Sequence, residues 1–108
     1  MIYQLVVYVP ADHAETLKDA LFDAGAGRYA HYDRCSWESS GTGQFRPLEG
    51  ANPAIGEHGV IETVKELKIE MVCTADVIKE VLSVLKKSHP YEEPAYGVFE
   101  IKTIEDFS

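Results

Sequence analysis

The sequence predicts an α+β fold in which an antiparallel sheet carries two helices on one of its faces. Two observations lead to this class. Segments rich in β-branched and aromatic residues alternate with two segments of helical periodicity, and their order along the chain is βαββαβ. The chain has 108 residues, 45% of them hydrophobic, which suits one core and therefore one domain, residues 1–108. This order is that of the ferredoxin-like sandwich.

The first strand and the first helix are predicted in the first quarter of the sequence. Ile2 to Val9 is rich in Val, Ile and Tyr, which favours a strand. Asp12 followed by Glu15 resembles a capping box, and Gly25 suits a helix C-terminus. Apolar residues recur between them at helical spacing: Leu17, Ala20, Leu21 and Ala24. We therefore expect a helix of about three turns.

The next part of the chain predicts a bent strand and a long loop. Residues 29–38 are aromatic, polar and β-prone, and residues 40–43 offer a turn before residues 44–46. We expect a strand that bends back on itself. Residues 41–59 hold five of the eight glycines and two prolines, which disfavours regular structure. The loop also has apolar residues that argue against disorder, so it is expected to be shaped and functional or interfacial: Phe45, Leu48 and Ile55.

The second half of the chain predicts a strand, a helix and a last strand. The apolar residues of 60–73 could form the apolar stripe of a helix. From Glu66 onward, however, apolar and charged residues alternate, which favours a strand with one solvent-exposed face. Thr74 can cap a helix whose apolar stripe ends before His89. The last strand runs from about Ala95 to Ile101. With both helices on one side, the other sheet face is open, and an apolar open face requires another subunit or a partner.

Composition and charge restrict the partners. The chain has 18 acidic and 10 basic residues, a formal net charge of −8, and its basic residues are spread out. Nucleic acid is therefore not expected as a partner, because phosphate binding needs Lys and Arg on one face. Without an export signal or an apolar run of membrane length, we expect a soluble, cytoplasmic protein with no membrane partner. Cys35 and Cys73 are expected to be free thiols, since their spacing matches no zinc motif.

The segment His89-Pro90-Tyr91-Glu92-Glu93-Pro94 is the densest polar constellation. It places an imidazole and two carboxylates between the second helix and the last strand, and these ligand types suit a borderline divalent cation. The prolines would lower the ordering cost of such a site. The alternative is structural: the prolines fix a turn, His89 caps the helix, and the carboxylates are solvated. Both interpretations stay open.

Other candidate groups are weaker. Gly41-Thr42-Gly43 resembles a phosphate-cradling loop but lacks the Lys and the following helix, so a hairpin turn is the preferred interpretation. His58 could ligate a metal or simply be a solvated loop residue. Cys35 and Ser36 have no base nearby in sequence that would activate them. Three glutamates would share one strand face and could bind a cation or do acid and base work, but a solvated sheet face is the ordinary explanation of such a pattern: Glu62, Glu66 and Glu70. No complete catalytic set emerges.

Several longer motifs, taken together and in order, resemble a known family. They are Gly25-Ala26-Gly27-Arg28-Tyr29, Cys35-Ser36-Trp37, the runs Gly41 to Pro47 and Gly50 to Gly56, and His89 to Tyr96. The chain resembles, over nearly its whole length, the inserted domain of long bacterial members of the Nif-three-like (Ngg-interacting factor three) family, as a stand-alone version. The pattern is shorter here between Gly27 and Tyr29.

The resemblance implies a PII-like or CutA-like ferredoxin-like fold and a homotrimer built through edge-strand pairing and packed sheets. His89-Pro90-Tyr91-Glu92 is similar to the HPYE portion of CutA proteins, whose histidine is linked to divalent metal binding. The continuation differs, because Glu93-Pro94-Ala95 replaces the Val-Pro-Glu of that pattern. Full-length Nif-three-like proteins carry a two-metal centre on flanking domains, with motifs that this chain lacks. No enzyme activity is therefore expected.

These observations lead to one preferred function and three alternatives. We expect a non-catalytic, oligomeric binding or regulatory module of sensor type. The alternatives are a divalent-metal binder for copper or zinc that uses His89 with Glu92 and Glu93, a small metal-dependent hydrolase, and a protein-interaction domain. The candidate ligand or interface residues are Cys35, Ser36, Gly41, Gly43, Phe45, Asn52, His58 and Tyr91.

Overall fold

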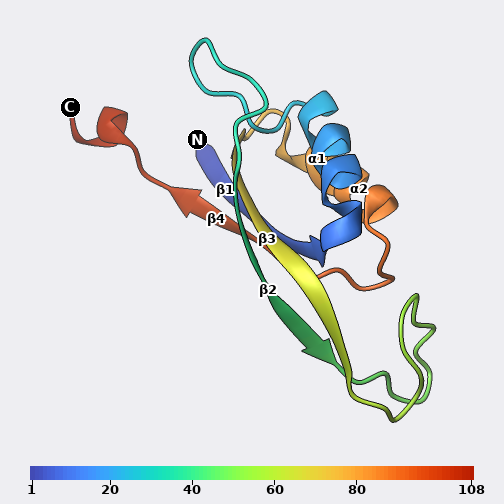
Figure 1. Ribbon diagram of the computed structural model, residues 1–108. Helices are drawn as coiled ribbons and strands as arrows, with labels where there is room; N and C mark the ends of the chain where they lie inside the picture. The colour runs from blue at the N-terminus through green and yellow to red at the C-terminus, as the bar shows by residue number, and fades with distance from the viewer.

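The computed structural model describes all residues, 1–108, and contains one four-stranded antiparallel sheet with two helices (Figure 1). The strand order is β2-β3-β1-β4. The elements are β1 (Ile2–Pro10), α1 (Ala14–Asp23), β2 (Trp37–Phe45), β3 (Glu62–Thr74), α2 (Ile78–Ser88) and β4 (Tyr96–Ile101), with short 3-10 turns at Ala11–His13 and Ile104–Phe107. The predicted α+β class and the βαββαβ order are confirmed.

The core lies between one face of the sheet and the two helices. Leu5 is paired with Met71 and Val7 with Ile69, and all four side chains are buried. Paired residues of neighbouring strands place their side chains on the same face, so these positions form the helix-covered face. The helices contribute the other buried side chains, among them Leu17, Leu21, Val81 and Leu85. The alternation predicted from Glu66 onward is therefore correct.

The predicted bend at residues 40–43 is wrong, because β2 runs straight through these residues. All nine residues of β2, Trp37 to Phe45, pair with β3, whose 13 residues are long enough to provide a partner for each. Residues 29–36 form an irregular loop with one local bridge, Tyr29 to Tyr32, and Arg34 has a positive φ of 55° that interrupts extended backbone. The strand therefore begins only at Trp37, and the long loop covers residues 46–61 instead of 41–59.

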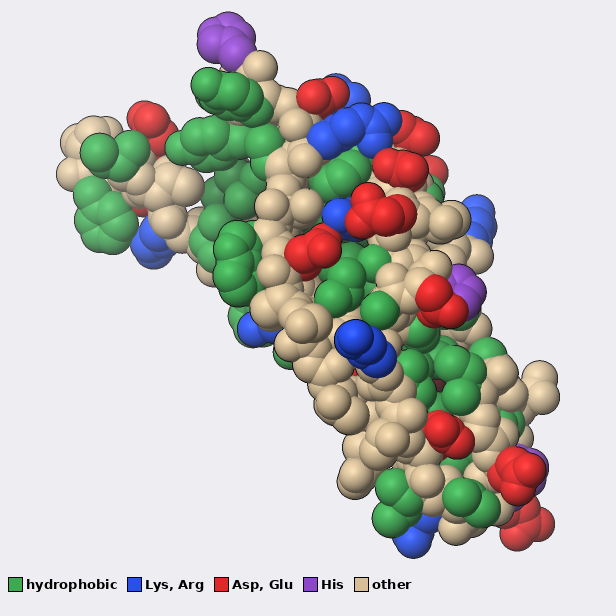
Figure 2. Space-filling model, viewed as in Figure 1, with side chains coloured by type: hydrophobic (Ala, Val, Ile, Leu, Met, Phe, Trp, Pro, Cys, Tyr) green, Lys and Arg blue, Asp and Glu red, His purple; other side chains and the backbone are tan.

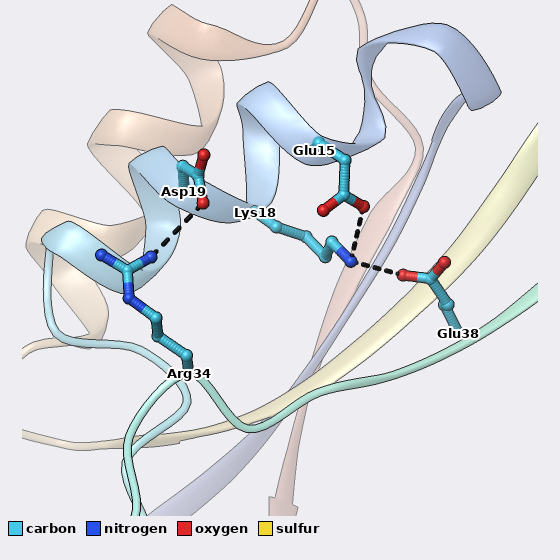
Figure 3. Close-up of polar contacts among 5 residues, drawn as sticks. All are labelled: Glu15, Lys18, Asp19, Arg34 and Glu38. Atoms are coloured by element: carbon cyan, nitrogen blue, oxygen red, sulfur yellow. Dashed lines mark hydrogen bonds and ion pairs between the residues drawn. The ribbon is translucent and has the colours of Figure 1, made fainter.

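Salt bridges attach this sheet edge and the preceding loop to α1 (Figure 3). The Lys18 ammonium lies 2.7 Å from a Glu15 oxygen and 2.8 Å from a Glu38 oxygen, so it joins α1 to β2. Arg34 donates to Asp19 and Asp23 of α1. The irregular loop is thereby tied to the helix on the covered side of the sheet.

The molecule is elongated, with extents of 52 × 25 × 23 Å. The paired ends of β2 and β3 extend beyond the helices and carry the loop 46–61 at their tip (Figure 1). We call these paired ends the β2–β3 arm, residues 39–45 and 62–68. Both chain termini lie at the other end, and no helix is long and apolar enough to cross a membrane.

Candidate functional site

A cavity of about 890 Å³ lies between the β2–β3 arm, the loop 46–61 and the turn 89–95 that follows α2. Its walls are mainly apolar, with Phe45, Pro47, Leu48 and Ile55 among the lining residues. Figure 2 shows hydrophobic side chains gathered over the arm and its loop, at the lower right. The size and the lining are those of a small-molecule site.

His89 fixes the start of the turn to β1. Its side chain is buried, Nε2 lies 2.7 Å from the Tyr8 carbonyl oxygen, and Nδ1 lies 3.1 Å from the Tyr91 backbone nitrogen. Because the Tyr91 N–H can only donate, Nδ1 accepts, and Nε2–H donates to the Tyr8 carbonyl. Burial lowers the pKa of the His89 imidazole, which outweighs the opposing hydrogen bond to Tyr8. The neutral ring therefore uses both of its nitrogens to hold the turn.

Tyr91 connects the turn to the arm. Its hydroxyl donates to Glu66 Oε2 at 3.1 Å, and its ring meets the Phe45 ring edge-on at a centroid distance of 5.7 Å. Burial, followed by the hydrogen bond to Glu66, raises the pKa of the Tyr91 phenol well above its ordinary value. The phenol consequently stays protonated and keeps donating to the carboxylate across the physiological range.

The long loop is closed on itself and on the turn. The His58 Nε2 atom lies 2.7 Å from the Ala51 carbonyl oxygen, and the Gly59 N–H donates to the Pro47 carbonyl at 2.7 Å. The Asn52 backbone N–H donates to the Glu92 carboxylate at 2.9 Å. The loop is therefore a shaped wall, as predicted, and Glu92 links it to the turn.

Gly43 leaves the space that the Glu66 side chain occupies. A Cβ atom at Gly43 would collide with the Glu66 carboxyl group, whose Oε2 would lie 2.9 Å away. Gly41, two residues earlier on the same strand, has no atom within 4 Å of such a Cβ. The glycine at 43 thus allows the carboxylate to lie across β2, where Tyr91 reaches it.

The charged groups around the cavity are partly unsatisfied. Lys68 and Arg46 line the cavity, and neither forms an ion pair within the chain. Glu66 accepts one hydrogen bond, at Oε2, and none at Oε1. The cavity therefore combines apolar walls with polar groups of both charges that a ligand can use.

The structure brings together most of the residues predicted for the site. Those that line the cavity are Gly41, Gly43, Phe45, Tyr91, Glu92 and Glu93. Asn52, His58 and His89 contact its walls from outside the lining. Cys35 and Ser36 lie elsewhere, in a shallow pocket beside Trp37, so they do not belong to this site. Both cysteines are free, Cys73 being buried.

Three cavity residues were not predicted for the site from the sequence: Tyr8, Glu66 and Lys68. Glu66 and Lys68 were recognised only as members of a wet strand face. Their placement depends on the pairing of β3 with β2, which puts Glu66 opposite Gly41 and Lys68 opposite Ser39. The one available signal was the pair of glycines in β2, of which Gly41 lies opposite Glu66 and Gly43 leaves room for the Glu66 carboxylate.

No group of three or more His, Cys, Asp or Glu side chains is arranged to hold a metal ion within the chain. His89 uses both ring nitrogens, and Glu92 accepts from the loop. A metal site formed by His89, Glu92 and Glu93 would require these contacts to change, or ligands from elsewhere. Copper or zinc binding stays a prediction.

Known proteins match this chain in sequence and in fold. No protein-family model matches the chain. A curated relative from Halalkalibacterium halodurans, named GTP cyclohydrolase 1 type 2 homolog, is 48% identical over 98 residues, which is 91% of this chain and 26% of the relative. A relative of the same name from Mycobacterium tuberculosis is 47% identical over 94 residues, 87% of this chain and 25% of the relative. The crystal structure of a Bacillus cereus protein related to NIF3 matches with a TM-score of 0.80 and 39% identity, over 94% of this chain and 26% of that one.

This chain is a domain of the NIF3 family. It spans about a quarter of the length of the curated NIF3-family relatives that it matches. The predicted family is thereby confirmed.

The CutA proteins share the fold of this NIF3-family domain. The periplasmic divalent cation tolerance protein CutA from Archaeoglobus fulgidus matches with a TM-score of 0.69 and 18% identity, over 99% of this chain and 91% of that protein. CutA from Pyrococcus horikoshii gives a TM-score of 0.68 at 20% identity, over 99% and 90% of the two chains. At such identities the match establishes the CutA-like fold alone, as predicted.

Proposed function

We propose that this NIF3-family domain is a non-catalytic, oligomeric binding or regulatory module whose ligand occupies the cavity beside the β2–β3 arm. The observation that carries the proposal is the construction of the cavity. The arm with its loop forms one wall, the turn 89–95, remote in sequence, forms the other, and hydrogen bonds of His89, Tyr91 and Glu92 hold these parts in place. Such a pre-formed, largely apolar cavity with a few polar groups is typical of ligand sites.

The residues that could do chemistry hold the walls instead. The His89 imidazole uses both nitrogens for backbone contacts, and the Tyr91 phenol donates to Glu66. A general base must reach a substrate proton, which an imidazole in this arrangement does not do without breaking a wall contact. These contacts support a binding role.

The exposed aromatic residues of the open sheet face support self-association. Phe99 is paired with Gln4 and Trp37 with Glu70, and the Gln4 and Glu70 side chains hydrogen-bond to each other across that face. Phe99 is 58% exposed and Trp37 is 63% exposed. The outer edge of β2 is unpaired as well, and both features suit contact with a second and a third copy of the chain. The oligomer that we propose is a trimer.

A fragment screen tests the binding role. The ¹⁵N-labelled chain is titrated with small neutral, cationic, anionic and zwitterionic aromatic compounds, and backbone amide shifts are followed. The proposal expects shifts that saturate and concentrate at residues 43–45, 51–55 and 91–95. Shifts that scatter over the surface with every compound would overturn the assignment of this cavity.

A divalent metal is the second candidate ligand. Glu92 and Glu93 line the cavity and follow His89 closely in the chain, and CutA proteins that share the fold are named for divalent cation tolerance. Calorimetric titration with zinc and copper compares the wild-type chain with His89→Asn and with a Glu92→Gln, Glu93→Gln double variant. Equal binding by all three proteins removes these residues from a metal site.

The curated relatives carry the name of a GTP cyclohydrolase homolog, but this domain spans only a quarter of their length. We propose that the domain alone does not turn over GTP. Incubation of GTP with the chain, with and without added zinc, is followed by chromatography of the nucleotides. Product formation that Glu62→Gln and Glu70→Gln variants abolish would overturn this proposal.

A further inference from the structure

Two opposite charges line the same cavity without meeting each other. Glu66 and Lys68 lie two residues apart on β3, and both line the cavity and are half-buried. No ion pair joins them, and Lys68 has no other ionic partner in the chain. Because charges out of bulk water are costly unless paired, a ligand that pairs both gains from both.

The two charges favour a ligand that carries both signs. Residues two apart on one strand face are about 6.6 Å apart along the strand, so both side chains reach the same part of the cavity. A small molecule that carries an ammonium and a carboxylate close together can donate to Glu66 and accept from Lys68 at once. A free α-amino acid carries this pair on a single carbon atom.

The apolar walls suit the side chain of such a ligand. The Tyr91 hydroxyl occupies Oε2 of Glu66, which leaves Oε1 for a ligand ammonium beside the aromatic pair Tyr91 and Phe45. Leu48, Pro53 and Ile55 extend the apolar lining on the loop side. The cavity volume of about 890 Å³ leaves space for a large apolar side chain.

Ligands with one charge fit less well. Three carboxylates, those of Glu66, Glu92 and Glu93, line the cavity against two cations, Lys68 and Arg46, so the excess of negative charge disfavours a purely anionic ligand. A purely cationic ligand would leave Lys68 unpaired and add repulsion from it. We therefore propose, on the basis of the binding role proposed above, that the cavity binds a free α-amino acid with a large apolar side chain. Its ammonium pairs with Glu66, its carboxylate with Lys68, and its side chain packs on Phe45 and Tyr91.

Three matched probes test the inference. The ¹⁵N-labelled full chain is titrated with L-phenylalanine, with 2-phenylethylamine, which lacks the carboxylate, and with 3-phenylpropanoate, which lacks the ammonium. L-Phenylalanine is expected to shift the amides of residues 43–45 and 91–95 and to bind about tenfold or more tightly than either analogue, since each loses one charged hydrogen bond.

Variants assign the two charges. Glu66→Gln and Lys68→Met are each expected to weaken L-phenylalanine binding about tenfold or more, whereas Lys68→Arg retains most of it. Glu70→Gln and Lys65→Met are the matched controls on the same strand, because neither residue lines the cavity, and both are expected to bind like the wild type. Amide spectra of each variant verify that the fold is intact.

The titrations distinguish failure of the amino-acid inference from failure of the proposed binding role. If either analogue binds at the cavity as tightly as L-phenylalanine, or if Glu66→Gln and Lys68→Met bind like the wild type, the amino-acid inference is overturned while the cavity remains a ligand site. If none of the three probes shifts the cavity amides, the inference is also overturned. The binding role then fails as well only if the whole fragment set leaves those amides unchanged.

Discussion

At the residue scale, Gly43 determines where the Glu66 carboxylate lies. Gly43→Ala would place a methyl group in the space of that carboxylate and force it away from the Tyr91 hydroxyl. We expect a loss of about 1–2 kcal/mol in the free energy of unfolding, because a half-buried hydrogen bond is broken. Urea denaturation measures the loss.

Gly41→Ala is the matched control for this prediction. It lies on the same strand, and an added Cβ there meets no atom within 4 Å. It should be neutral or slightly stabilising, since alanine in an extended strand costs less conformational entropy than glycine. Equal effects of the two substitutions would show that the position of Glu66 does not depend on Gly43.

The buried His89 imidazole predicts an acid-sensitive fold. Its folded pKa lies below the ordinary value of 6.5 because of burial, while Glu66 opposes the shift and His13 adds to it. In the unfolded chain the ring gains a proton as pH falls through 6.5, but the folded chain resists it. Stability is therefore lost as pH falls below 6.5, until the folded pKa is reached.

Urea denaturation between about pH 8 and about pH 5 measures this dependence, with His89→Asn as the reference. Asparagine does not titrate, and its side-chain oxygen can still accept from the Tyr91 N–H as Nδ1 does. The carboxylates of the chain contribute equally to the pH dependence of both proteins, and only the wild type has the titrating imidazole at position 89. The variant should therefore lose less stability than the wild type over that range. An identical pH dependence would assign the acid sensitivity to other groups.

The site residues differ in how far the sequence could predict them. His89, Tyr91 and Glu92 stand in one short segment with two prolines, which the sequence predicted as the best candidate site, and the structure places this segment beside the cavity. Glu66 and Lys68 could not be assigned, because their position beside that segment depends on strand register over a long sequence separation. The cavity itself arises only when the arm with its loop meets the turn 89–95, which is remote in sequence.

At the scale of elements, the Lys18 ammonium joins α1 to β2. The side chain is only 14% exposed and lies between Glu15 and Glu38 (Figure 3). Its pKa is raised by the hydrogen bonds to these two carboxylates, first that of Glu15 and then that of Glu38. Lys18→Met should lower the free energy of unfolding by about 1 kcal/mol, because Glu38 loses its partner.

Thermal and urea denaturation check this effect against Lys79→Met. Lys79 is exposed on α2 and forms no ion pair, so its substitution should change stability little. Equal stability of the Lys18 and Lys79 variants would mean that hydrophobic packing alone holds α1 against the sheet.

The helices and strands were predictable where the burial of one face imposes a regular spacing on the apolar residues. The apolar positions of β3 alternate strictly from Leu67, and those of α2 recur at helical spacing, so both were found. The start of β2 was misplaced because residues 29–36 have strand-like composition without a partner strand. The pair of glycines in β2 resembles a turn signal, whereas Gly43 allows the close approach of Glu66 and Gly41 faces open space.

At the scale of the whole molecule, the open sheet face predicts association of copies. Phe99→Glu places a charge on the exposed part of that face, at the edge strand β4, and it should convert the proposed trimer to a monomer in size-exclusion chromatography with light scattering. Tyr32→Glu is the control, since Tyr32 is 72% exposed but lies on the loop after α1. A wild-type chain that is monomeric at high micromolar concentration would contradict the trimer.

The elongated shape separates the cavity from both ends of the polypeptide. The termini lie at one end of the molecule, and the β2–β3 arm carries the loop 46–61 at the other (Figure 1). Immobilisation on a biosensor chip through either terminus, or fusion of a fluorescent reporter there, should therefore leave the cavity accessible. The same separation means that β3, which runs from the arm to the end where it pairs with the start of β1, is the direct connection between a bound ligand and anything attached at the termini.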